Sequence, residues 1–422
     1  MPFPRNVAAA ALGLFLSVGA RTASAYDVAT SSTGAPLHWE TSEVSFALAL
    51  DPGPGTMTTA EGSNAAAAAI AAWHDPLAGY GIELSLAPTP VAAASHTRDG
   101  VNTIRWAIDS TDPDREPGLL ARTFAVYQTG NGALIDTDIV FDAVDFQWSP
   151  DVSNCVQEYD FANALTHELG HAVGLAHSMG HPEATMFVTG DACETQKRDL
   201  APDDLEGLGQ LYAPPPEEMP AATGCAASQG GGLGVVVLVV LALGIARRRR
   251  AHAAFTLGVA LVAGVQLDAE AGALRHLEIA ELRANAALVV RGRVVNTQAV
   301  RARGIETDAT IVVDECLGGS CPRTLVVRRF GGELDGVGMF VDGEARLDPG
   351  DEVVLFVRVD RDRHARVAGG VQGLLRVENA GAVTRVVRDL RGHRIATSGG
   401  WRDGEREVFD FATLQSQLRA AR

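Results

Sequence analysis

The chain has 422 residues, with 52 acidic and 35 basic side chains and a formal net charge of −17. A surface that binds nucleic acid needs a stripe of basic side chains, so this charge argues against nucleic acid as a partner.

The first 25 residues have the composition of an export signal. Arg5 precedes an apolar stretch over residues 7–20, and Ala23, Ser24 and Ala25 follow it. This order predicts a signal peptide over residues 1–25 that is cleaved before Tyr26. The apolar stretch is too short to span a membrane comfortably.

The next part of the chain alternates between predicted strands and one helix. Apolar residues alternate over residues 42–50, which predicts a half-buried strand. Thr58 and Glu61 have the spacing of a capping box and open an alanine-rich helix that runs to about Trp73. Residues 82–86 and 102–106 are predicted to be short strands.

The most informative run is His-Glu-Leu-Gly-His-Ala-Val-Gly-Leu-Ala-His at residues 167–177. On a helix His167 and His171 share a face, and Glu168 leans toward the same point. Gly174 lets the chain turn so that His177 arrives as a third ligand. Three neutral imidazoles leave tetrahedral zinc with an open position for water, whose pKa falls to about 7. The run predicts a hydrolytic site; the alternative, ordinary helix histidines, leaves the five fixed positions unexplained.

This eleven-residue pattern resembles the metzincin clan of zinc peptidases, and its surroundings resemble the matrixin branch. Residues 136–142 resemble the edge strand that lines the substrate cleft just before the zinc helix. Residues 184–187 are similar to the Met-turn, with Met186 as an apolar floor beneath the metal. Residues 198–212 resemble the final helix, with Asp203 or Asp204 near its start. The resemblance spans about residues 34–213.

The resemblance implies an α+β fold, in which a mixed twisted sheet carries the zinc helix and a C-terminal helix. It also implies one catalytic Zn2+ held by His167, His171 and His177, and a protein or peptide substrate. Glu168 would accept a proton from the attacking water and pass it to the leaving amine.

Some family features are missing. No second, histidine-rich zinc site is indicated, and Ca2+ is left open without a ligand pattern. A cysteine-bearing inhibitory propeptide is also absent, so any latency must come from elsewhere. His181 lies beside Pro182 and is interpreted as a loop residue rather than a spare ligand.

Five cysteines fit an oxidising compartment. Cys155 and Cys193 could clamp the segment before the zinc helix to the loop after the Met-turn, and Cys316 and Cys321 could close a small loop. Free buried thiols are the alternative for each pair. Cys225 is left over.

The segment around Cys225 resembles a Myxo-type C-terminal sorting signal, which retains exported proteins at the cell surface. A Pro/Gly-rich linker holds the cysteine, and an apolar run over residues 233–246 precedes arginines 247–250. The resemblance implies envelope sorting and processing machinery as a partner. In that family the arginines end the chain, whereas here the chain continues.

Two explanations for the continuation stay open. A second apolar run, residues 253–267, could form a membrane hairpin with the first, with the arginines on the cytoplasmic side. Alternatively, residues 247–271 have the pattern of a second signal peptide, and the chain joins two exported proteins. We favour the second explanation slightly, because both runs are short for a hydrocarbon core of about 30 Å.

The region after residue 272 has short β-branched runs separated by turn residues, over residues 287–295, 310–313, 325–330, 352–359 and 374–377. They predict a separate small all-β barrel or sandwich, OB-like in one reading, that is closed by a helix over about residues 411–418. The sequence thus predicts six segments: a signal peptide (1–25), a matrixin-like peptidase domain (26–213), a linker (214–232), an apolar helix with arginines (233–250), a second apolar segment (251–271) and a β-rich accessory domain (272–422).

The leading hypothesis is an exported zinc endopeptidase of the cell envelope, either surface-anchored or secreted. The first alternative is a surface-anchored binding or adhesion protein with a catalytically silent zincin domain. In the second alternative, the C-terminal domain carries the main function and the peptidase only processes the anchor. An intact Glu168 favours the enzyme, because a binding role would not require it.

Overall fold

The computed structural model describes residues 26–214 and 274–420, except for short gaps at 93, 95, 151–152, 154, 179–180, 188–191, 381–382, 391–393 and 398–399. The predicted signal peptide, the linker with Cys225, both apolar runs and the arginine cluster lie outside the described residues. None of the helices within the described ranges combines the length and apolar character that a membrane span requires.

The first part of the chain forms a mixed sheet with the strand order β4-β5-β3-β1-β2, in which β4 alone runs antiparallel to its neighbour. The strands are β1 (Glu43–Ala49), β2 (Glu83–Leu86), β3 (Asn102–Ala107), β4 (Ala121–Gln128) and β5 (Leu134–Asp142). The three strands predicted between residues 42 and 106 are confirmed as β1, β2 and β3. Two short strands, β6 (Trp148–Ser149) and β7 (Tyr159–Asp160), pair with each other before the next helix.

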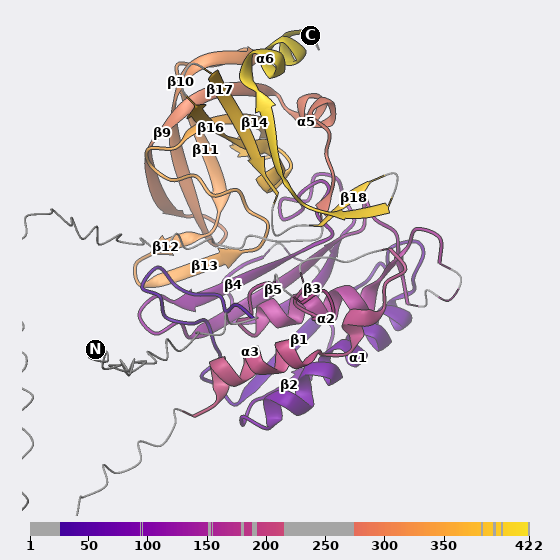
Figure 1. The fold of residues 1–422 in the computed structure, drawn as a ribbon. Helices are drawn as coiled ribbons and strands as arrows, with labels where there is room; N and C mark the ends of the chain where they lie inside the picture. The colour runs from indigo at the N-terminus through magenta and orange to yellow at the C-terminus, as the bar shows by residue number, and fades with distance from the viewer. Residues whose placement is uncertain are drawn as a thin grey trace, which may run out of the picture. The chain divides into compact units, whose positions relative to one another are not determined.

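Three helices accompany this sheet: α1 (Thr59–Ala78), α2 (Phe161–Ala172) and α3 (Pro202–Tyr212). Figure 1 shows α1 and α2 next to each other, and their packing is anchored where the Trp73 indole donates to the Thr166 carbonyl oxygen at 2.7 Å. The predicted capping box of Thr58 and Glu61 is confirmed, and α1 runs past Trp73 to Ala78. The final helix starts at Pro202, later than residue 198, because proline suits the first helical position.

One strand prediction is wrong. Residues 136–142 were expected to be the edge strand of the substrate cleft, but they lie in β5, which pairs with β3 on one side and β4 on the other. Nearly every residue of β5 is buried, as is typical of an interior strand. The outermost strand of residues 26–213 on this side is β4, which the sequence patterns did not reveal.

The C-terminal residues form a second, eight-stranded sheet with the order β15-β11-β10-β9-β14-β16-β17-β20. Because β15 also pairs with β14, the strands β9, β10, β11, β15 and β14 close into a ring around an apolar core. The bounds are β8 (Leu274–Arg275), α5 (Ile279–Asn285), β9 (Leu288–Arg301), β10 (Ile305–Gly318), β11 (Thr324–Phe330), β12 (Gly332–Leu334), β13 (Val337–Val341), β14 (Glu352–Val359), β15 (Ala365–Val367), β16 (Leu374–Ala380), β17 (Val383–Asp389), β18 (Arg394–Thr397), β19 (Gly400–Asp403), β20 (Arg406–Asp410) and α6 (Phe411–Ala420). The five predicted strand runs and the terminal helix are confirmed.

Two strands of the C-terminal region leave its own sheet. β12 and β13 form a hairpin, and β13 pairs antiparallel with β4, so the first sheet has seven strands in the order β12-β13-β4-β5-β3-β1-β2. The prediction of a separate domain did not anticipate this shared sheet.

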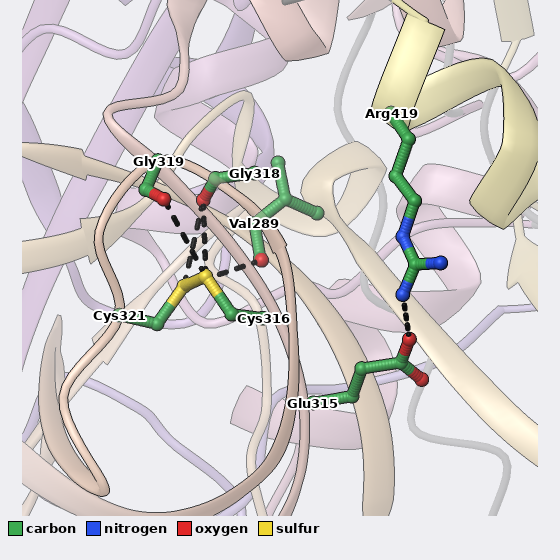
Figure 2. The surroundings of a disulfide bond; sticks show 7 residues. All are labelled: Val289, Glu315, Cys316, Gly318, Gly319, Cys321 and Arg419. Carbon is green, nitrogen blue, oxygen red and sulfur yellow. Dashed lines mark hydrogen bonds and ion pairs between the residues drawn. A yellow bond between two sulfur atoms is a disulfide. The ribbon is translucent and has the colours of Figure 1, made fainter.

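Both predicted disulfides are present, Cys155–Cys193 and Cys316–Cys321. Figure 2 shows the second one closing the turn at the end of β10. Glu315, also on β10, forms a 2.7 Å ion pair with Arg419 of α6, and this contact links the helix to the strand. The two cystines therefore staple a loop in each region of the chain.

Candidate metal centre

Helix α2 carries two of the three candidate ligands, His167 and His171, and is fixed at its start. Asp160 caps the helix by accepting from the Asn163 amide at 2.8 Å, and the Arg198 side chain donates to the same carboxylate. All residues of α2 except Ala164 are buried. His167 and His171 therefore lie on a helix that is packed on nearly every side.

The structure brings the three predicted histidines together. The Nε2 atom of His177 lies 2.9 Å from the Nε2 atoms of both His167 and His171. Gly174 makes this return possible: its φ is 97°, and a Cβ there would lie 2.0 Å from the carbonyl oxygen of Leu37. Nitrogens this close can share one zinc ion about 2.0–2.1 Å from each of them.

The other ring nitrogens set the tautomers of two of these histidines. His167 donates from Nδ1 to the Thr185 carbonyl oxygen at 2.7 Å, and His171 donates from Nδ1 to the Leu175 carbonyl oxygen at 2.9 Å. Each Nε2 is therefore left without a proton, as a metal ligand must be. Burial lowers the pKa of His171 to about 4, and burial together with Lys197 holds the pKa of His167 well below 6.5. This donor set fits a zinc ion.

The turn below the ligands is held by the final helix. The Asp204 carboxylate accepts from the backbone amides of Thr185 and Met186, each at 2.8 Å. Met186 is 2 % exposed and packs against α2, where a Cβ on Gly170 would lie 2.1 Å from its sulfur. Of the two aspartates that the sequence left open, Asp204 is thus the one that fixes the position of the Thr185 carbonyl, and with it His167.

Glu168 lies beside the histidines and is 7 % exposed. The Thr123 hydroxyl on β4 donates to its Oε2 at 2.6 Å. Burial raises the pKa of Glu168 to about 7, against the opposing effects of the Thr123 hydrogen bond and the Lys197 charge. A carboxylate with a pKa near neutrality can accept a proton and give it back, as a general base and acid must.

Two side chains from residues 26–213 that lie at the site were missed by the sequence reasoning. Thr123 lies on a strand that no pattern predicted. Lys197 lies in a 3-10 turn, Gln196–Arg198, and is 1 % exposed, with its Nζ donating to the Phe187 carbonyl oxygen and lying 3.5 Å from His167 Nδ1. A lysine between two predicted elements gave no signal of burial.

His181 does not join the group. Its side chain is 38 % exposed, and its Nδ1 lies 2.9 Å from a Glu183 carboxylate oxygen. Among the described residues, the histidines that could hold a metal are His167, His171 and His177. The interpretation of His181 as a loop residue is consistent with this geometry.

A residue of the C-terminal region also reaches the site. Asp342 directly follows β13, is 3 % exposed, and places its Oδ1 3.8 Å from Nδ1 of His177. No sequence pattern pointed to it, because its position depends on the pairing of β13 with β4.

A mixed sheet, a ligand-bearing helix with a third histidine after a glycine turn, and a methionine floor together define a zincin-type α+β region. Comparison with known families agrees, because residues 38–213 match the family model described as Matrixin. Residues 38–213 therefore resemble the Matrixin family in sequence as well as in the arrangement of sheet, helices and histidines.

Known proteins similar to this chain include several metalloproteinases. Human Matrix metalloproteinase-16 is 38 % identical over 115 residues, which cover 27 % of this chain and 18 % of the relative. Human Neutrophil collagenase is 35 % identical over 104 residues, 25 % of this chain and 20 % of the relative. Human Matrilysin is 36 % identical over 104 residues, 25 % of this chain and 35 % of the relative. The matched stretch thus spans about a third or less of the length of these relatives.

Proposed function

We propose that this chain is an exported zinc endopeptidase that hydrolyses peptide bonds in protein or peptide substrates. His167, His171 and His177 would hold one zinc ion, and Glu168 would act as the general base. The observation that supports this most directly is the convergence of three Nε2 atoms beside a carboxylate that Thr123 holds in place.

In this mechanism each residue of the site has a distinct role. When bound, zinc supplies a Lewis acid that polarises the scissile carbonyl and lowers the pKa of water. Glu168 takes the proton of the attacking water on its carboxylate and gives it to the leaving nitrogen. Thr123 keeps Oε2 of that carboxylate oriented, and the buried surroundings strengthen these interactions by excluding bulk water.

The wider assignments follow from the sequence. Export rests on the signal peptide at residues 1–25, and the cell envelope on the segment over residues 233–267, as a sorting signal, a membrane hairpin or a second signal peptide. Residues 272–422 are proposed to be an accessory domain. A silent zincin domain in a binding protein is less well supported, because it gives no reason for a buried Glu168 with its own hydrogen-bond donor.

The test uses the full chain and its Glu168→Gln variant, each loaded with zinc and incubated at high concentration with an unfolded protein such as casein. We expect one zinc per chain in both proteins, and cleavage that depends on Glu168. His171→Ala should lose the zinc. Failure of the chain to take up zinc, or cleavage that Glu168→Gln leaves unchanged, would refute the proposal.

A further inference from the structure

The outer edge of β4 is occupied by the chain's own C-terminal region. β13 runs antiparallel to β4 from Val337 opposite Gln128 to Val341 opposite Phe124 (Figure 1). A sheet edge presents N–H and C=O groups that an extended peptide can pair with. Here the place beside β4 that an extended substrate would need is already taken.

The hairpin that fills this edge is formed by local chemistry. Asp335 and Gly336 connect β12 to β13 with φ values of 54° and 79°. An Asp-Gly pair with positive φ at both positions is the turn that favours a two-residue hairpin. Residues 332–342, here called the hairpin segment, therefore present a preformed strand rather than a loop that happens to lie nearby.

Glu333 anchors the hairpin segment to the peptidase region. Its carboxylate accepts from the Tyr127 hydroxyl at 3.0 Å and from the Ser32 amide at 2.7 Å. The Tyr127 ring also lies across Gly338, where a Cβ would come within 2.2 Å of the ring carbon Cζ. Because the ring is 5 % exposed and its hydroxyl is bonded, it has little room to move. Glycine at 338 is required for this fit.

Apolar and charged contacts continue toward the site. One buried cluster mixes Phe124 and Val126 of β4 with Met339 and Val341 of β13. Beside it, the Arg122 guanidinium, 2 % exposed, forms a 2.7 Å ion pair with Glu344. Burial of both kinds of group makes this an interface of packed side chains rather than a surface contact.

The hairpin segment ends at the candidate ligands. Asp342 lies 3.8 Å from His177, and the residue before it, Val341, pairs with Phe124, the neighbour of Thr123. The three histidines and Glu168 are all 7 % exposed or less. A strand that follows β4 in the antiparallel direction thus carries its backbone up to the ligands, as the backbone of a bound substrate would have to.

We propose that the hairpin segment is a built-in inhibitor, which holds the peptidase latent by occupying the substrate's place along β4. This inference rests on the proposed function. The chain becomes active when β13 leaves the edge, so the rate of cleavage measures the fraction of molecules in which the edge is open.

The first test displaces the strand in the full chain. Gly338→Leu should push β13 from β4 through the Tyr127 ring, and Gly130→Leu is the matched control, because a Cβ at Gly130 meets nothing within 4 Å. Hydrogen exchange should become faster at the amides of Ala125 and Tyr127. These amides face β13, because the Thr129 amide donates to the Gly336 carbonyl oxygen at 3.0 Å and the hydrogen-bonding positions alternate along an antiparallel pair. Casein cleavage should rise at least about tenfold, the factor that about 1.4 kcal/mol of lost pairing gives. The control should match the original chain in both measurements.

The second test locks the strand. Gln128 and Val337 face each other at the far end of the pairing and are not buried. By the same alternation they form a non-hydrogen-bonded pair, whose close side chains suit a disulfide. The oxidised Gln128→Cys/Val337→Cys chain should cleave at least about tenfold more slowly than its reduced form, a loss of about 1.4 kcal/mol in opening. The original chain, given the same reductant, controls for the native disulfides.

The outcomes separate the two proposals. In one outcome, hydrogen exchange becomes faster in Gly338→Leu but cleavage stays at the measurable, Glu168-dependent rate of the original chain. This result would support the proposed peptidase function and overturn the proposed inhibition. Equal cleavage by the oxidised and reduced locked chains overturns it as well, whatever the exchange shows. If no zinc-loaded variant cleaves although exchange shows that the edge is open, the proposed function itself fails.

Discussion

Replacing Glu168 by glutamine should stabilise the metal-free protein at neutral and higher pH. Glu168 is 7 % exposed, and burial raises its pKa from 4.5 to about 7. The folded protein therefore binds a proton here over a pH range in which the unfolded chain has released it. This difference corresponds to about 3 kcal/mol, at about 1.4 kcal/mol for each pKa unit.

The sign follows from the raised pKa. Below about pH 4.5 the side chain is protonated in both states, so Glu168 and glutamine should be nearly equal. Between about pH 4.5 and 7 the unfolded chain has released this proton while the folded chain keeps it, so the original chain loses stability relative to Glu168→Gln as the pH rises. Above about pH 7 the folded state holds a buried charge and the full difference is present. His167 and His171 have lowered pKa values and make the protein less stable as the pH falls, but both chains carry them. The difference between the chains isolates Glu168.

The assay is urea unfolding of chelator-treated full chain and variant, followed by tryptophan fluorescence at several pH values. Four of the five tryptophans, namely Trp39, Trp73, Trp106 and Trp148, are buried in the core of the matrixin-like region, so fluorescence reports mainly on the unfolding of that region. We expect the variant to gain up to about 3 kcal/mol above neutrality and almost nothing in acid. A difference that stays constant across this range would show that the buried carboxylate does not titrate with folding.

Two further predictions concern the frame around the site. Gly170→Ala should lower the free energy of unfolding by about 1–3 kcal/mol, because its Cβ would overlap the sulfur of Met186. Gly130→Ala, in open space, should change it by less than about 0.5 kcal/mol, and equal losses would contradict the packing argument. Replacing Cys155 and Cys193 by serine opens a loop with a sequence separation of 38 and should cost about 4 kcal/mol in thermal unfolding by the chain-entropy relation; a loss below about 1 kcal/mol would contradict it.

The metal centre could be predicted because its geometry is almost entirely local. The spacing of His167 and His171 becomes a spatial relation as soon as the segment is helical. Gly174 then limits where the chain can go, and its positive φ is a property that the residue type itself signals. The carbonyl oxygens that accept from Nδ1 of His171 and His167, those of Leu175 and Thr185, also lie within or shortly after this stretch of sequence.

The rest depends on strand order, which periodicity does not encode. Residues 136–142 contain three aspartates, and charged side chains are typical of edge strands. Asp136 and Asp138 are nevertheless buried, because backbone amides of the neighbouring loop donate to them. In the sequence Thr123 is an ordinary β-branched residue, and its role beside Glu168 becomes visible only when β4 is packed against α2. The Asp335–Gly336 turn was not among the predicted elements. Its residue types favour a hairpin, but nothing in them says that the hairpin joins another sheet.

Strand β4 serves two purposes that its geometry keeps apart. Side chains of a strand stand roughly perpendicular to the sheet, whereas its backbone N–H and C=O groups lie in the plane of the sheet. The Thr123 side chain, perpendicular to the sheet, holds Glu168, whereas the backbone groups of β4 in the plane of the sheet pair with β13. The hairpin segment can therefore leave or return without turning the Thr123 hydroxyl. In the proposed mechanism, β4 therefore orients the general base through a side chain and controls the access of substrate through its backbone, so opening the edge exposes a site that is already arranged.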